Sequence, residues 1–172
     1  MLLCSGNSKK FHLIDIKKKA IIQIFEGHEK GILTTTFLGQ NKIISVSKDK
    51  TVRVWNINDP KEKAQFTPHT TFVYSVATHK QNFATGDADG HIFIWKDGIS
   101  EPLQTFVSDD AIVNSMLFSA NGKQLYVGRD DGFIEIDVNG GTPSFTYLWS
   151  NGSTSQNLRA LTFGSYVVTV TD

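Results

Sequence analysis

The sequence predicts an all-β protein built from repeated four-stranded antiparallel units, and three observations carry this prediction. The first is a period of 40 residues, which separates Trp55 from Trp95 and Asp49 from Asp89. The second is that each period contains short runs in which apolar and polar residues alternate, as is typical of strands. The third is that no window shows a capped apolar stripe at helical spacing, so almost no helix is expected.

Each unit is expected to contain four strands joined by polar turns. An alternating first strand is followed by a polar turn and a second strand. A tight turn rich in Asp, Gly and Lys then leads to the third strand, which carries the Trp, and a short fourth strand follows. The expected first strands are residues 32–37, 73–76 and 113–118, and the expected fourth strands are residues 20–25, 63–66 and 102–106.

A period of about 40 to 45 residues is typical of propeller blades, so residues 1–138 are expected to form blades. Their approximate ends are residues 26, 67, 107 and 138, and the first unit begins at its second strand. This amounts to about three to three and a half blades, whereas a closed propeller typically has about four to eight. The sequence therefore predicts a partial β-propeller, which is a fragment of a larger protein, a truncated gene product or one arc of a shared ring.

Two units carry the residue pattern of a known family. Gly27-His28, together with Val54-Trp55-Asn56, resembles the WD-repeat β-propeller family. The resemblance implies a hydrogen-bond network within each blade that joins the His, a Ser or Thr of the second strand, the turn Asp and the Trp. In this sequence the network would comprise His28, Ser45, Asp49 and Trp55 in one blade, and His69, Thr85, Asp89 and Trp95 in the next.

The third unit keeps little of this pattern. Asp109 stands in the His position, Val127 in the hydroxyl position and Asp137 in the Trp position. Only Asp131 matches, so the third blade is expected to be degenerate.

The composition changes near residue 139, where Lys disappears and Ser, Thr, Gly and Asn surround aromatic residues. Residues 139–172 resemble the SprB-type repeat of large bacterial surface adhesins, with Gly-Gly-Thr-Pro, then aromatic-x-Trp-Ser-Asn-Gly, and finally Val-Thr-Val-Thr-Asp. The resemblance implies a small immunoglobulin-like β unit. A unit this short buries little core alone, so it is expected to pack on the last blade or on residues beyond 172.

An aromatic strip in this segment allows two interpretations. Phe145, Tyr147 and Trp149 alternate with other residues along one expected strand. They can form the small core of the repeat, which is the favoured interpretation, or a surface on which sugars stack.

Composition excludes several classes of function. The chain has 17 Lys+Arg and 17 Asp+Glu, so no basic excess indicates nucleic-acid binding. Cys4 is the single cysteine, which rules out an internal disulfide or a Cys-based zinc site. The five His residues have no metal-ligand spacing, and no apolar run approaches the roughly 20 residues of a membrane span. We expect no metal, no cofactor and no membrane span.

A hydrolytic triad is one hypothesis, because His69, Thr85 or Ser45, and Asp89 supply its three residue types. The same residues stand at the spacing of the structural network, in which the Asp orients a buried His and the His contacts the hydroxyl. No motif for an oxyanion site accompanies them. We therefore predict a structural network and no catalytic residue.

The sequence predicts a non-catalytic scaffold for protein–protein interactions, belonging to a larger bacterial surface or secreted protein. An intracellular WD-repeat regulatory scaffold and a hydrolytic enzyme are the alternatives. The C-terminal repeat favours an extracellular or cell-surface location, and the cytoplasm is the alternative. Self-association that completes the propeller ring is a further hypothesis.

The resemblance implies that partners bind at the top rim of the propeller and at the loops that connect blades. The candidates follow the His positions, and Phe72 is the expected anchor because an aromatic residue on an exposed loop is a common hot spot. They are Glu29, Lys30, Thr70, Thr71, Phe72, Asp110 and Ala111.

Overall fold

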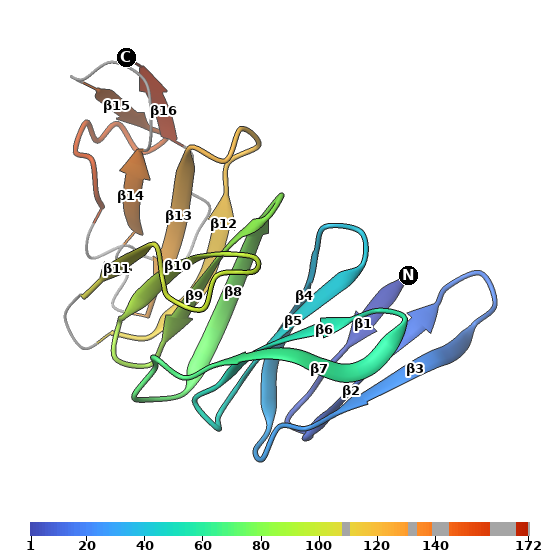
Figure 1. Cartoon of the computed structure of the whole chain (residues 1–172). Coiled ribbons are helices and arrows are strands. Elements are labelled where there is room, and N and C mark those ends of the chain that lie inside the picture. The colour runs from blue at the N-terminus through green and yellow to red at the C-terminus, as the bar shows by residue number, and fades with distance from the viewer. Residues whose placement is uncertain (108–110, 131–133, 139–144, 159–167, 172) are drawn as a thin grey trace.

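The structure is a computed structural model that describes residues 1–107, 111–130, 134–138, 145–158 and 168–171, without the side chains of 62, 63 and 135–138. The strands in these residues pair antiparallel and form five sheets, of which the first four follow one another along an open arc (Figure 1). This arrangement confirms the predicted all-β class and the partial propeller. Within the described part of the chain, no helix has the length and apolarity that crossing a membrane requires.

Two sheets are complete blades whose four strands keep the order of the sequence. The first comprises β4 (Ile32–Leu38), β5 (Lys42–Ser47), β6 (Val52–Asn56) and β7 (Asp59–Phe66), and the second comprises β8 (Val73–His79), β9 (Asn82–Asp87), β10 (Ile92–Lys96) and β11 (Gln104–Phe106).

Two further sheets have three strands each and lie at either end of the arc (Figure 1). They comprise β1 (Leu2–Cys4), β2 (Lys10–Asp15) and β3 (Ala20–Glu26) at one end, and β12 (Val113–Phe118), β13 (Gln124–Arg129) and β14 (Ile134–Val138) at the other. The strands β4, β8 and β12 contact one another in turn, so they form the inner edge of the arc. The first sheet begins with the counterpart of β5, as expected from the sequence.

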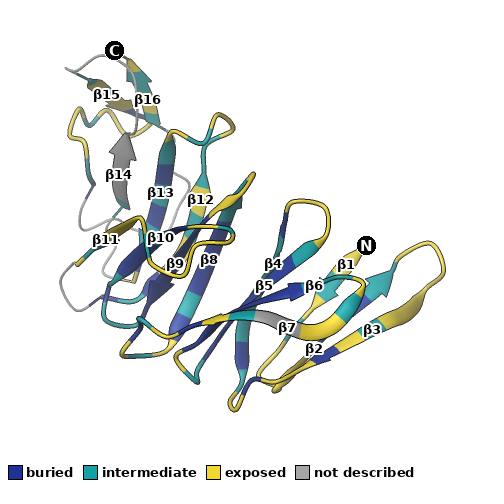
Figure 2. Cartoon of the chain, in the orientation of Figure 1, coloured by how far each residue is buried: buried dark blue, intermediate teal, exposed yellow. Residues whose placement is uncertain are grey.

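Neighbouring sheets pack face to face, and one apolar cluster fills each junction (Figure 2). We call the face of a sheet that contacts the next sheet along the chain its forward face, and the opposite face its backward face. Trp55 and Trp95, each 1% exposed, lie on backward faces. The clusters are Phe11, Leu13, Phe25, Ile32, Ile43 and Trp55; Leu38, Ile44, Val46, Val52, Val54, Phe66, Val73, Val76, Phe83, Phe93 and Trp95; and Ala77, Ala84, Ile92, Val113, Leu125 and Val127.

Hydroxyl groups on the inner strands also join neighbouring sheets. Thr34 Oγ1 donates a hydrogen bond to the backbone oxygen of Tyr74 at 2.8 Å, and Ser75 Oγ donates to that of Val113 at 2.7 Å. Gly86 leaves room for this second contact, because a Cβ atom at Gly86 would lie 2.7 Å from Val113 Cβ. The close approach of the two sheets therefore requires glycine at this position.

The C-terminal segment packs on the last blade, as the sequence predicts. β15 (Thr146–Trp149) pairs with β16 (Val168–Thr171), and the buried Trp149 and Leu158 contact Tyr126 and Ile134 of the blade. Ile134 and Leu158 also exchange two backbone hydrogen bonds of 2.9 Å. The burial of Trp149 favours the core interpretation of the aromatic strip.

Candidate interaction rim and its supporting networks

Two loops carry most of the predicted binding residues. One joins β3 to β4 and the other joins β7 to β8, so each loop connects the outer strand of one sheet to the inner strand of the next. Both loops begin beside a buried His, and the contacts of that His determine how the loop is held.

The first network brings together all four of its predicted residues. His28 Nδ1 lies 2.7 Å from Asp49 Oδ2, and His28 Nε2 lies 2.7 Å from Ser45 Oγ. Trp55 Nε1 donates a hydrogen bond to the same Ser45 oxygen at 2.8 Å. The imidazole is therefore held from both sides within the blade.

Asp49 connects this network to the loop and to the turn between β5 and β6. Its Oδ2 atom accepts a hydrogen bond from the Glu29 amide at 2.9 Å, and its Oδ1 atom accepts from Thr51 Oγ1 at 2.6 Å. Burial raises the pKa of Asp49, but the hydrogen bonds from Thr51, His28 and the Glu29 amide outweigh it and lower the pKa to about 2. The side chain therefore remains a carboxylate at neutral pH.

The second network contains a correction to the predicted residues. Thr85 Oγ1 lies 2.8 Å from His69 Nε2 and accepts from Trp95 Nε1 at 2.9 Å, as predicted. His69 Nδ1, however, contacts Asp87 Oδ2 at 2.8 Å, and not Asp89. Asp89 contributes its backbone amide, which donates to Asp87 Oδ1 at 3.0 Å.

The residue two positions after the hydroxyl explains why Asp87 replaces Asp89. Thr85 and Asp87 are two residues apart on β9, so their side chains point to the same face. β5 also ends two residues after its hydroxyl, but that residue is Ser47, so the turn residue Asp49 contacts the His of the first blade. In the second blade the residue is Asp87, which contacts the His directly. The predicted position relied on the spacing to the Trp. The spacing of two residues from Thr85 was a signal in the sequence that could have identified Asp87.

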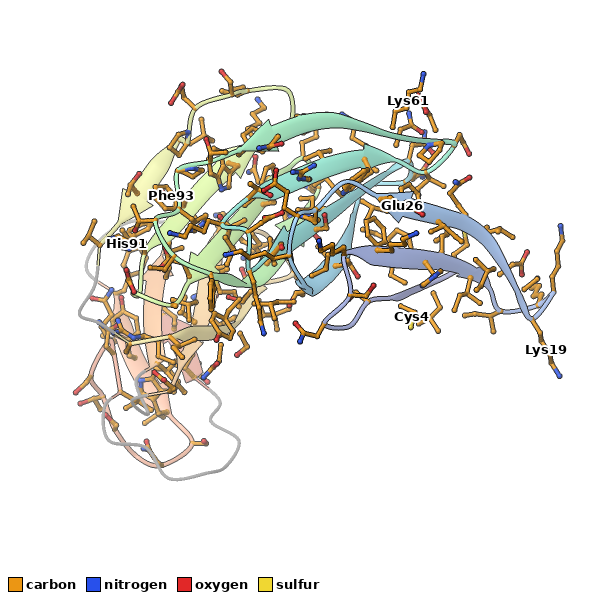
Figure 3. All side chains as sticks on the ribbon, turned by 90° about the horizontal axis from the view of Figure 1, so that it is seen from below. Cys4, Lys19, Glu26, Lys61, His91 and Phe93 are labelled. Carbon is orange, nitrogen blue, oxygen red and sulfur yellow. The ribbon has the colours of Figure 1, made fainter. Side chains whose placement is uncertain are left out.

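Asp87 holds the second turn much as Asp49 holds the first. Its Oδ1 atom also accepts a hydrogen bond from the His91 amide at 2.9 Å, and the Ala88 amide donates to the Phe72 oxygen at 3.0 Å. Burial raises the pKa of Asp87, but contacts with His69 and His91 outweigh it, and the pKa lies below its ordinary value. In Figure 3 this turn, labelled at His91, lies far from the turn at Lys19, which projects at the N-terminal end of the arc.

The last blade replaces the hydroxyl of the network with an apolar side chain. Val127 is 3% exposed and lies in the cluster with Leu125 and Val113, which confirms that this blade departs from the pattern. Asp109 and Asp131, and the side chain of Asp137, lie outside the described residues.

The predicted rim residues differ in their exposure. Glu29, Lys30 and Thr70 are exposed, and Phe72 is 38% exposed. Ala111 is buried at 8% exposure and is therefore not available to a partner, contrary to its selection as a rim residue. Asp110 lies outside the described residues.

Thr71 is half-buried, and its Oγ1 atom is enclosed without a hydrogen-bond partner among the described groups. We call Glu29, Lys30, Thr70, Thr71 and Phe72 the rim; their role in binding stays a prediction.

The first network has the atom contacts of a hydrolytic triad but no access for a substrate. Ser45 is 0% exposed, and its oxygen already accepts a hydrogen bond from Trp55. Thr85 is likewise 0% exposed beneath Trp95. Across the described residues, no group of three or more His, Cys, Asp or Glu side chains is placed to hold a metal ion. The arrangement supports the loops and satisfies buried polar groups.

Antiparallel sheets in chain order, with a His–hydroxyl–Trp network buried in two of them, define a propeller protein built from sequence repeats. The family model described as "WD domain, G-beta repeat" matches residues 19–56, 60–96 and 100–136. The chain therefore belongs to the WD-repeat family. The SprB repeat model matches residues 127–154.

Curated relatives share modest identity with the chain. The guanine nucleotide-binding protein subunit beta of Saccharomyces cerevisiae is 26% identical over 67% of the chain and 29% of the relative. Apoptotic protease-activating factor 1 of Rattus norvegicus is 26% identical over 72% of the chain and 11% of the relative. A U3 small nucleolar RNA-associated protein 15 homolog of Xenopus tropicalis is 28% identical over 74% of the chain and 26% of the relative. The chain spans less than a third of the length of these relatives.

The repeats found by the family model are offset from the sheets by one strand. Each match includes the outer strand of one sheet, β3, β7 or β11, followed by three strands of the next sheet. The SprB match begins at residue 127, inside β13, and overlaps the third WD repeat. The predicted division at residue 139 therefore stays a prediction.

Proposed function

We propose that the protein is a non-catalytic scaffold that binds a protein partner through the rim. The observation that carries this proposal is a pair of exposed loops tied to buried networks. The Glu29 amide is held by Asp49, and the Phe72 carbonyl is held by the Ala88 amide beside Asp87. Loops fixed in this way lose little conformational entropy on binding.

Phe72 is the proposed anchor. Phe72 is 38% exposed on a loop, and the exposed Thr70 near it supplies a hydroxyl group. Aromatic residues contribute strongly to interfaces because they bury a large apolar area at a small entropic cost. Glu29 and Lys30 add one charge of each sign on the neighbouring loop, which suits a polar border around the anchor.

The relatives and the buried networks support a binding role in preference to catalysis. One relative is by name a subunit of a guanine nucleotide-binding protein, and another is an activating factor. The hydroxyl groups that resemble nucleophiles are completely buried beneath Trp residues. A scaffold uses these groups for rigidity alone.

The SprB match supports a location on the surface of a bacterial cell. Repeats of this type resemble those of adhesins, and the match covers residues 127–154. Protease treatment of intact cells provides the test. We expect the protein to be degraded on intact cells, whereas protection until the cells are lysed would support the intracellular alternative.

Crosslinking at single positions tests the rim. A photoreactive phenylalanine analogue placed at residue 72 is compared with the same analogue at residue 103, because Leu103 is 51% exposed and lies outside the rim. We expect a discrete protein adduct from residue 72 and none from residue 103. Equal adducts from both positions, or none from residue 72, would contradict the proposal.

A further inference from the structure

A cavity remains on the forward face of the last blade, beside the C-terminal segment. Its volume is about 460 Å³, within the range of about 300–1,000 Å³ that is usual for binding pockets. The lining is mostly apolar, with a hydroxyl group at one side. The lining residues include Ser115, Leu117, Tyr126, Gly128, Trp149 and Val168.

The junction between the second complete blade and the last blade shows which kind of side chain packs on a forward face. Ser75 and Gly86 are paired across β8 and β9, next to a register shift in β8. The Val113 side chain of the next sheet lies against Gly86, and Ser75 Oγ donates a hydrogen bond to the Val113 oxygen at 2.7 Å. A Ser–Gly pair on a forward face thus receives a β-branched residue of an extended strand.

The last blade repeats this Ser–Gly pair. Ser115 and Gly128 are partners across β12 and β13, next to a register shift at the same place in β12. A Cβ atom at Gly128 would lie 2.7 Å from Ser115 Oγ, compared with 3.0 Å between a Cβ at Gly86 and Ser75 Oγ. The two pairs therefore have similar geometry.

The two Ser–Gly pairs differ in what packs against the glycine. Among the described residues, nothing except Ser115 comes within 4 Å of a Cβ at Gly128. Within the same residues, no group accepts a hydrogen bond from the Ser115 hydroxyl. Trp149 and Val168 of the C-terminal segment line the cavity on the side of β14. The part of the face beside β12 is left as a slot, in which Leu117 is 65% exposed.

We propose that this slot binds an extended peptide segment of a partner protein. The segment places a Val or Ile side chain against Gly128, and its backbone carbonyl accepts a hydrogen bond from Ser115 Oγ. The slot continues the row of junctions that joins the other sheets, so the partner segment takes the place of the next inner strand.

A second copy of the chain does not supply this segment. Its described inner strands β4, β8 and β12 are packed against one another. Trp149 and Val168 also occupy the side of the face on which the outer strands of a whole sheet would lie. A single extended segment fits where a sheet does not.

The slot is separate from the rim, and the proposal is independent of binding there. The rim precedes β4 and β8, whereas the slot lies on β12 and β13 and beside β15 and β16. A partner can therefore be lost at one surface and retained at the other.

Fluorescence anisotropy with the full chain tests the slot. The probe is a labelled synthetic peptide with the sequence of residues 111–118 and a Lys-Lys tail, because Val113 of this sequence occupies the equivalent position beside Gly86. We expect saturable binding, weakened about tenfold or more when the peptide carries Val113→Asp. Gly128→Val, which fills the slot, should weaken binding by at least about tenfold, and Ser115→Ala by about two- to tenfold.

Two control variants keep the test falsifiable. A Cβ at Gly6 meets no atom within 4 Å, so Gly6→Val should bind the peptide as the native chain does. Phe72→Ala should also leave peptide binding unchanged. In case Gly128→Val fails to fold, the double variant Ser115→Ala with Gly128→Ala places a methyl group in the slot and removes the hydroxyl that it would contact.

Three results of the binding experiment would overturn the proposal. They are the absence of saturable binding up to roughly 1 mM peptide, equal binding by native and slot variants, and loss of peptide binding in Phe72→Ala, which would move the site to the rim. A dimer in sedimentation experiments that Gly128→Val dissociates would also overturn it, because the occupant would then be a second copy.

Discussion

At the scale of single residues, the hydrogen-bond direction in the first network follows from the donors available. Asp49 only accepts, so the proton of the His28 ring lies on Nδ1 when the ring is neutral. His28 Nε2 then accepts from the Ser45 hydroxyl, whose oxygen in turn accepts from Trp55 Nε1. Each buried polar atom in this row has a partner, and removing one member leaves a neighbour unsatisfied.

Asp87 and Asp89 offer a direct comparison of a network residue with a turn residue. Asp87→Ala removes the acceptor of His69 and of the Asp89 and His91 amides, so we expect a loss of about 2–3 kcal/mol in unfolding free energy. Asp89→Ala should stay within about 0.5 kcal/mol. Thermal unfolding measures both, and a larger effect for Asp89→Ala would contradict the assignment.

The low pKa of Asp49 makes stability depend on acid. Because the pKa is about 2 in the folded chain and 3.8 ordinarily, the carboxylate stabilises the fold above about pH 4. This contribution, about 2 kcal/mol, should be lost as the pH falls from about 5 to 2. Urea unfolding over this range should show a flatter pH dependence for Asp49→Asn than for the native chain. Identical pH profiles would argue against the shift.

Seven of the eight predicted network residues lie where the sequence pattern placed them, because the strands and turns around them are regular. The exception, Asp89, was chosen by its spacing to Trp95, whereas a carboxylate two residues after Thr85, which the first blade lacks at Ser47, takes the contact with His69. Ala111 was wrongly selected for the rim because its place after the His position does not reveal its burial.

At the scale of elements, the two tight hairpin turns differ at the position that has a positive φ angle. Lys50 and Gly90 occupy equivalent positions, and both have positive φ angles, of 72° and 85°. Glycine adopts this conformation freely, whereas the Cβ atom of lysine is strained there.

The substitution Lys50→Gly should therefore raise the free energy of unfolding by about 0.5–1 kcal/mol, because it removes the strain at a small cost in chain entropy. Gly90→Lys is the matched reverse change and should lower the free energy of unfolding by a similar amount. Both are measured by urea unfolding at pH 7. A stabilising effect of Gly90→Lys would show that the turns are not equivalent.

The strands were predicted best where apolar and polar residues alternate. The expected strand 113–118 coincides with β12, and residues 32–37 fall one residue short of β4. The expected strand 63–66 covers only the second half of β7, because the first half, Asp-Pro-Lys-Glu, has no alternating pattern. Pairing with β6 forms this half of the strand, and local sequence does not encode that contact.

At the scale of the whole molecule, the Gly86 and Gly128 positions distinguish a filled junction from an open one. Gly86→Val would force apart the second complete blade and the last blade, because Val113 fills the space, and should cost about 1–3 kcal/mol. Gly128→Val should cost less, since the exposed Ser115 side chain can rotate away. Chemical denaturation of both variants gives the comparison, and equal losses would contradict it.

The number of blades and the packing of the C-terminal segment on the last one could be predicted, since both follow from repeat length and from the area that a short unit can bury. The hydrogen bonds between Ile134 and Leu158 and the slot beside Gly128 could not. Ser115 and Gly128 do repeat Ser75 and Gly86 from one blade to the next, but the sequence does not show that the space beside them is left open. Nor does it show which distant segment pairs with Ile134.

The one-strand offset between repeats and sheets has a consequence for splitting the chain. A break between Ile57 and Asn58, in the turn between β6 and β7, separates two polypeptides that still share one sheet, because β7 of the second completes the sheet of the first. Co-expressed halves should therefore assemble and elute together in gel filtration, whereas halves that elute separately would show that β7 does not hold them. The chain could then serve as a two-part reporter whose reassembly restores both this sheet and the apolar junction with the next one.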